Sequence, residues 1–168
     1  MLWHTKTGRL ALSAVFLALA MIVSYIESMM TFSPFPGVKL GLSNVVIMFL
    51  FFRVGKTEAI SVSVVRVILI SILFGNLASF VFSAAGGALS LASMFVSLTF
   101  KDKISFFGIG VLSSSIHGVG QIIGFAALYS APGAVMYLPV LLLTSVPLGL
   151  LSGGLIVLLD KKIKLAGE

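Results

Sequence analysis

The sequence predicts an all-α integral membrane protein: a single domain, residues 1–168, built as a bundle of about six transmembrane helices. The first observation is the composition, which is 59% hydrophobic and 10% charged, whereas soluble domains contain about a quarter charged residues. The second is that the apolar residues occur in long runs, comparable to the ~20 residues that a spanning helix requires. Because no linker is long enough to divide the chain, one compact domain is expected.

Polar or helix-breaking residues separate the apolar runs into candidate segments. The second run has about 13 residues, too few to cross a bilayer alone as a helix. The first resembles a signal peptide, but its long apolar run, with no polar domain behind it, favours a retained helix. The segments are roughly Leu10–Met29, Leu40–Phe52, Ala59–Phe74, Leu77–Phe100, Ser105–Tyr129 and Tyr137–Leu159.

The stretch TFSPFPGVK precedes the short second segment and contains Pro34 and Pro36. Prolines this close stop a helix and favour extended backbone. Non-helical backbone at membrane depth occurs only where protein buries it or water reaches it. We therefore expect this stretch to enter or cap the outer mouth of a cavity, with an ordinary surface turn as the alternative.

The basic residues predict the orientation of the bundle. If six segments alternate across the bilayer, the basic residues of the gaps and ends fall on one side, and Lys39 alone falls on the other. The positive-inside rule then places both termini in the cytoplasm. This distribution explains the net charge of +6 without a nucleic-acid-binding surface. The residues on the first side are Lys6, Arg9, Arg53, Lys56, Lys101, Lys103, Lys161, Lys162 and Lys164.

Polar side chains inside the apolar segments gather in the outer half of the predicted bundle. His117 lies near the middle of the fifth segment, and Gln121 lies one turn further out on the same helix face. Ionisable groups within a membrane usually face a cavity and mark a functional site, so we expect an outward-facing binding cavity. The other members are Glu27, Asn76, Ser79 and Ser83, with Arg66 at mid-depth and Lys39 on the outer loop.

Two structural alternatives are open for these polar groups. In the first, these groups form interhelical hydrogen bonds whose only role is to hold the bundle together. In the second, Arg66 forms a structural ion pair with Glu27.

Small residues form a second pattern. Ala14 and Ala18 make an AxxxA motif in the first segment, with Ala11 one turn below. Such stripes let helices approach closely, and packing within the bundle is their ordinary role. The alanine stripe lies in the predicted cytoplasmic half, where docking of a partner helix from outside is an equal alternative. GxxxG pairs occur at Gly120/Gly124 and Gly149/Gly153.

Several motifs in order resemble the substrate-binding S component of energy-coupling factor (ECF) transporters. More narrowly, the chain resembles the Gx transporter family, also labelled heptaprenyl diphosphate synthase component I. The similarity extends nearly end to end, except that Gly118 stands where we expect an asparagine. The motifs are SYIESM, PFPGVKLGLSNVV, VVRVILISILFGNLASFVFSAAGGALS, IHGVGQ and YLP.

The resemblance implies a mechanism and partners in the cytoplasmic membrane of a prokaryote. S components bind a small molecule from outside, associate with a membrane T protein and two ATPase subunits, and topple to release the cargo. The expected cargo here is a vitamin-like molecule or, from the synthase label, an isoprenoid or quinone precursor. The T protein contacts the small-residue face of the first helix, which by position is Ala14 and Ala18, with Ala11 nearby. The implied pocket residues are Lys39, Asn44, Ser79, Ser83, His117 and Gln121, with Glu27 and Arg66 as neighbours.

The acidic residues argue against catalysis, despite the synthase label. Prenyl diphosphate synthesis requires clustered aspartates that hold magnesium, whereas this chain has five acids, and Asp102 and Asp160 are isolated. With no cysteine there is also no thiolate metal site. We expect no enzyme activity, metal or cofactor. The VGKT stretch lacks the first glycine of a phosphate-binding loop, since Leu50 stands there, so any ATPase is a separate chain.

Three alternatives to the S component are open. The first is a membrane accessory subunit associated with polyprenyl diphosphate or quinone synthesis. The second is a structural or assembly protein with a packed interior. The third is a stand-alone carrier, for which more intramembrane acids than Glu27 would be expected.

Overall fold

The computed structural model describes residues 5–29, 41–74, 76–100 and 103–165. These residues are almost entirely helical, and they contain no strand. This result confirms the predicted all-α class. The elements are α1 (Lys6–Met29), α2 (Asn44–Arg53), α3 (Lys56–Phe74), α4 (Leu77–Thr99), α5 (Phe106–Tyr129), the 3-10 helix η2 (Pro132–Tyr137) and α6 (Leu138–Leu165).

Among the described residues, five helical stretches are long and apolar enough to cross a membrane: α1, α3, α4, α5 and the span 133–158, which joins η2 to α6. The sixth, α2, has 10 residues and rises only about 15 Å, half the thickness of the hydrocarbon core. The sequence therefore predicted a short second segment correctly. It begins at Asn44 rather than Leu40, because Gly41 adopts a left-handed conformation (φ 87°) that interrupts the helix.

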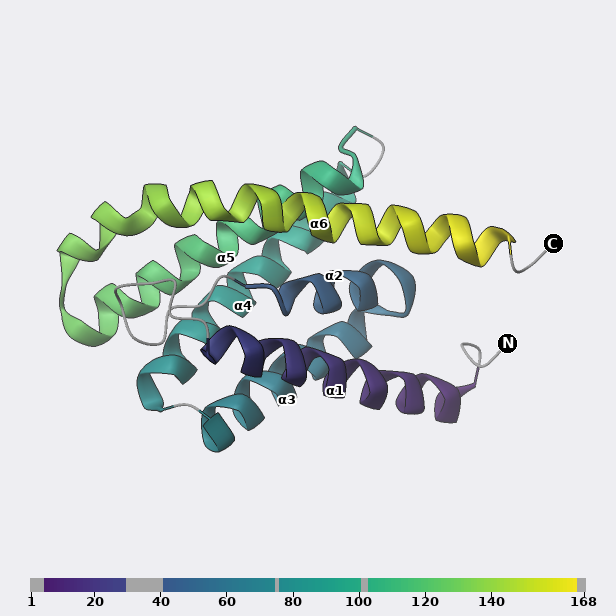
Figure 1. The fold of residues 1–168 in the computed structure, drawn as a ribbon, viewed down its shortest axis with the longest axis horizontal. Coiled ribbons are helices and arrows are strands. Elements are labelled where there is room, and N and C mark those ends of the chain that lie inside the picture. Colours follow the sequence, from purple (N-terminus) through teal and green to yellow (C-terminus); the bar gives the residue numbers. More distant parts are fainter. Residues whose placement is uncertain (1–4, 30–40, 75, 101–102, 166–168) are drawn as a thin grey trace.

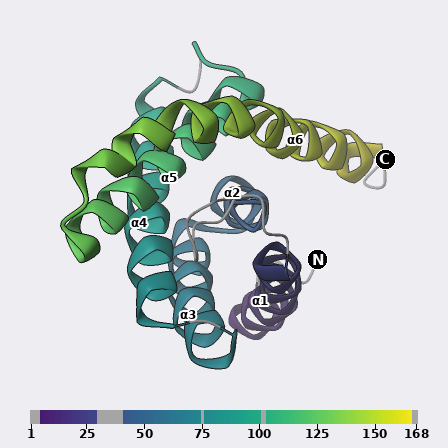
Figure 2. The same ribbon diagram turned by 60° about the vertical axis from the view of Figure 1, so that its left-hand side comes forward.

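The short helix α2 occupies the centre of the bundle. Figure 2 shows α2 enclosed by the other five α-helices, and it contacts each of them. Eight of its ten residues are buried, so its sequence is apolar on all sides rather than along one stripe. Ile47, Met48 and Leu50 form a core with Met94 and Ile156.

Helix α1 lies at the edge of the bundle. Within the described part of the chain it packs on α2 and α3 alone, and its buried residues are Ala20, Ser24 and Glu27. Its opposite face is exposed. Figure 1 shows that α1 begins and α6 ends at the same end of the molecule.

The glycine pairs of α5 and α6 lie inside the bundle. A Cβ added to Gly120 would lie 2.7 Å from the Ala85 carbonyl oxygen of α4, and one added to Gly149 would lie 2.3 Å from the Val111 Cα of α5. Gly153 is equally close to α5, at 2.5 Å from the Phe107 Cα. Both GxxxG motifs therefore bring helix backbones together inside the bundle.

Candidate functional site

The carboxylate of Glu27, near the end of α1, accepts hydrogen bonds from the backbone that leads into α2. Its Oε1 accepts from the backbone N–H groups of Gly41 and Leu42, the latter at 3.0 Å. The Ser43 hydroxyl donates to Oε2 at 3.5 Å. A negative charge at this position also suits the positive end of the α2 dipole. Glu27 therefore fixes the start of α2 from another helix.

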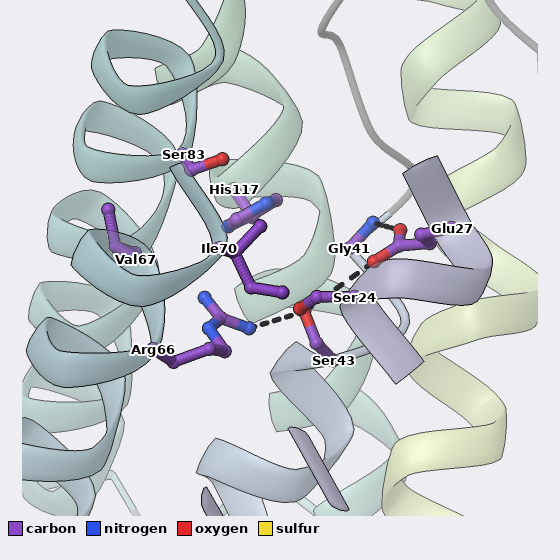
Figure 3. Close-up of a pocket in the computed structure, with 9 residues that line it drawn as sticks. All are labelled: Ser24, Glu27, Gly41, Ser43, Arg66, Val67, Ile70, Ser83 and His117. Atoms are coloured by element: carbon purple, nitrogen blue, oxygen red, sulfur yellow. Dashed lines mark hydrogen bonds between the residues drawn. The ribbon is translucent and has the colours of Figure 1, made fainter. Parts of the chain in front are cut away.

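Arg66 projects from the middle of α3 toward the same place. Its side chain is buried (4% exposed), and its Nη1 donates a hydrogen bond to Ser43 Oγ. Since the same hydroxyl donates to Glu27, Ser43 connects the cation to the carboxylate (Figure 3). The two charges are thus linked through a hydroxyl that the sequence did not single out.

His117 of α5 lies against two glycines. A Cβ on Gly41 would lie 2.9 Å from Cδ2 of the imidazole, and a Cβ on Gly86 would lie 3.0 Å from Cε1. The imidazole therefore fits where both neighbours lack a side chain, and any larger residue would push against it.

A small polar cavity lies among these groups, bounded by α1, α3, α4, α5 and the turn before α2. Its volume is about 10 Å³, which is room for about one water molecule. Two cationic or basic side chains, one carboxylate and three hydroxyls converge on it. The lining residues are Ser24, Glu27, Gly41, Ser43, Arg66, Val67, Ile70, Ser83 and His117 (Figure 3).

Four of the predicted site residues meet at this cavity, namely Glu27, Arg66, Ser83 and His117. Lys39, together with Pro34 and Pro36, lies outside the described residues.

Three other predicted residues are buried away from the cavity lining. Asn44 donates to Ser113 Oγ at 3.1 Å, and this hydroxyl lies 2.8 Å from that of Ser90. Ser79 follows the helix cap of α4, where its backbone N–H donates to Asn76 Oδ1 at 2.8 Å. Gln121 is 1% exposed, with its Cγ 3.0 Å from the Cβ position of Gly86.

Ser24, Gly41 and Ser43 line the cavity but were not among the predicted site residues. Ser24 had a signal, since it lies three residues before Glu27 and shares its helix face. Gly41 and Ser43 lie within the motif PFPGVKLGLSNVV, but their place at the cavity depends on where α2 begins.

The alanine stripe of α1 faces outward. Ala11, Ala14 and Ala18 are all exposed, beside the exposed apolar side chains of Leu10 and Val15. Nothing else in the described part of the chain covers this face, so it is open to lipid or to another protein.

The sequence model of a family described as heptaprenyl diphosphate synthase component I matches residues 16–159. The chain belongs to this family. The match confirms the resemblance noted from the motifs and covers every cavity-lining residue described above. The heptaprenyl diphosphate synthase component I description names one component of a synthase. Comparisons with curated proteins and with solved structures gave no significant match.

In the described ranges, no three side chains of the kinds that bind metals (His, Cys, Asp, Glu) come together.

Proposed function

We propose that this protein is the substrate-binding S component of an ECF-type importer. In this role it captures a small molecule from outside the cell and delivers it by docking with a T protein and two ATPase subunits. The supporting observation is the convergence of Arg66, His117 and Glu27 on one buried cavity, from three different helices. Burying charged and polar side chains costs free energy, and ionisable groups inside a membrane usually mark a functional site. A ligand-binding site accounts for their burial here.

The exposed face of α1 supports the docking half of the proposal. In this arrangement the T protein packs a helix against Ala14 and Ala18, with Ala11 at the edge. Small side chains let two helix backbones approach closely, which strengthens association where the hydrophobic effect is absent. An alanine stripe buried inside the bundle would have argued for packing alone, but these three residues are exposed.

Both termini are cytoplasmic in the proposed orientation. The basic residues at the start of α1 and in the α2–α3 and α4–α5 connections then face the cytoplasm, as the positive-inside rule requires. That α1 begins and α6 ends at one end of the bundle agrees with termini on the same side of the membrane (Figure 1). The polar cavity lies nearer the opposite end, toward the outside.

Capture of an organic molecule requires the cavity to open, since its volume of about 10 Å³ holds only about one water molecule. Helix α1 is the element best suited to move, because it packs on only two helices within the described residues. Its displacement would carry Glu27 away from Ser43 and widen the space in front of Arg66.

Mass spectrometry of small molecules extracted from the purified protein tests this function directly. We expect one compound to be retained at close to equimolar amount by the wild type and lost from Arg66→Gln. A wild-type protein that is folded, carries no such compound and does not associate with a T protein would refute the S-component assignment.

The family description supports a second candidate. It names a component of heptaprenyl diphosphate synthase, so a membrane accessory subunit associated with polyprenyl diphosphate or quinone synthesis, without catalysis of its own, is the alternative. Co-purification with a soluble prenyl synthase, and not with a T protein and ATPases, would favour it.

A further inference from the structure

A second pocket lies between the N-terminal parts of α1 and α3. Its volume is about 320 Å³, within the size range of small-molecule sites. No residue lines both this pocket and the cavity at Arg66. Because α1 and α3 are each long enough to cross the membrane, their first turns lie at its surface, where the phosphate groups of lipids are found.

The charged groups of this pocket leave one positive charge available to an anion. Lys6, Arg9 and Glu58 line it, and Arg9 Nη1 lies 3.2 Å from Glu58 Oε1. The Glu58 carboxylate also folds back on the start of α3, where its Oε2 would collide with a Cβ on Gly55, a position that suits a helix N-terminus. Lys6 is exposed and forms no ion pair with any described residue.

Hydroxyl groups line the pocket at a greater depth in the membrane than Lys6. Ser13 follows Lys6 by seven positions, and Ser61 follows Lys56, the first residue of α3, by five. The rise of a helix therefore places both serines about 7–11 Å further into the bilayer. Neither hydroxyl forms a hydrogen bond within the part of the chain that the structure describes, so each can donate one to a carbonyl group.

The surface beyond these hydroxyls is apolar. On α3, the side chains of Val64, Ile68 and Ile72 follow Ser61 at helical spacing along one face, and all three are exposed. On α1, the exposed side chain of Leu10 forms an apolar wall of the pocket. From the membrane surface inward, the order is thus cation, hydroxyl and hydrocarbon. A phospholipid has the matching order of phosphate, ester and acyl chain.

We infer that this pocket binds an anionic phospholipid. Lys6 and the Thr57 hydroxyl contact its phosphate, Ser13 and Ser61 donate to its esters, and an acyl chain lies along the apolar face of α3. Basic pockets between spanning helices are typical sites for anionic lipid headgroups. A soluble phosphate would share the contact with Lys6 but would leave the deeper hydroxyls and the apolar face unused. The bound lipid joins α1, the edge helix, to α3.

Two lipids with the same acyl chains test the role of the headgroup charge. Dioleoyl phosphatidylglycerol is anionic, and dioleoyl phosphatidylcholine has no net charge. A basic side chain near the membrane surface contributes about fivefold to the binding of an anionic lipid. The wild type should therefore bind the phosphatidylglycerol at least about fivefold more tightly. Native mass spectrometry of the full chain, titrated with each lipid in detergent, measures both affinities.

The variant Lys6→Gln removes the available charge, and Lys103→Gln is its matched control. Both lysines are exposed, but only Lys6 lines the pocket. Lys6→Gln should lower the affinity for phosphatidylglycerol about fivefold and remove most of the preference over phosphatidylcholine. Lys103→Gln should change either affinity less than about twofold. Equal losses in the two variants would assign the preference to the overall charge of the protein and overturn the site.

The ester contacts have their own test. The double variant Ser13→Ala and Ser61→Ala should weaken both lipids about threefold or more and leave their affinity ratio intact, because both lipids carry the same esters. Ser28→Ala, at the other end of α1 and outside the pocket, is the control and should change neither affinity. Unchanged lipid affinities in the double variant would overturn the proposed binding mode.

Inorganic phosphate distinguishes a lipid from a soluble anion. In excess, it should fail to displace phosphatidylglycerol from the wild type. Displacement would show a site for soluble anions and overturn the lipid assignment, as would equal affinity of the wild type for the two lipids. Since this pocket and the cavity at Arg66 share no residue, either result would leave the proposed capture function standing.

Discussion

Gly86 of α4 faces His117 of α5 so closely that a Cβ at residue 86 would lie 2.9 Å from the carbonyl oxygen of His117 and 3.0 Å from its Cε1. The neighbouring Gly87 is different, since its nearest atom to an added Cβ is Ser63 Oγ at 3.6 Å, an ordinary contact. Gly86, and not Gly87, therefore allows α4 and α5 to pack closely beside the cavity.

Gly86→Ala should destabilise the protein by about 1–3 kcal/mol, because the added methyl must displace a backbone carbonyl and the imidazole. Gly87→Ala is the matched control and should be neutral or slightly stabilising, since alanine favours a helix more than glycine does. Thermal unfolding in detergent measures both. Equal effects at the two positions would show that the close contact with His117 does not limit stability.

Glu27→Gln should cost about 1–3 kcal/mol of stability, because a buried charge that accepts backbone and hydroxyl hydrogen bonds is lost. The control is Glu58→Gln, which removes the 3.2 Å ion pair with the half-exposed Arg9. Pairs at such sites contribute about 0–1 kcal/mol. Chemical unfolding of the two variants should therefore rank Glu27→Gln as the more damaging; the reverse order would contradict the anchoring role of Glu27.

His117→Ala should weaken binding of the natural ligand by about 1–3 kcal/mol, roughly five- to 150-fold, because His117 lines the cavity. Gln121→Ala should instead lower the melting temperature with smaller change in affinity, since Gln121 is buried outside that lining. Titration calorimetry and thermal melts separate the two effects. A large affinity loss in Gln121→Ala at unchanged stability would place its amide in the binding site.

The double variant Ala14→Leu and Ala18→Leu should abolish association with the T protein and leave ligand binding intact, because the added bulk separates two helix backbones. Ala127→Leu, at an exposed position of α5, is the control and should still associate. Co-purification from membranes measures association. Unfolding of the double variant in detergent would instead assign the stripe to internal packing.

Single cysteines test the orientation, which is straightforward because the chain contains none. Cysteines at Lys6 and Lys103 should react only with reagents that cross the membrane. A cysteine at Gly133, where an added Cβ meets no atom within 4 Å, should react from outside. Labelling of Lys103 and Gly133 from the same side would refute the proposed topology.

The sequence by itself determined the membrane character, the all-α fold class and the family of this protein. Apolar runs are a local property of the sequence, so their positions were enough to locate α1 and α3 to α6. The length of the second run also predicted that α2 is short. The order of the motifs was enough to indicate the family. Helix ends were less accurate, because Lys6 and Lys56 continue helices beyond the apolar runs that the sequence marks.

Only the tertiary structure decided which polar residues meet. Glu27, Arg66, Ser83 and His117 converge on one cavity, whereas Asn44 turns instead to Ser113. Depth in the membrane was predictable from helical rise, but the direction in which each side chain points depends on the rotation of its helix against its neighbours. That rotation is set by close contacts such as Gly86 against His117, which involve residues far apart in sequence.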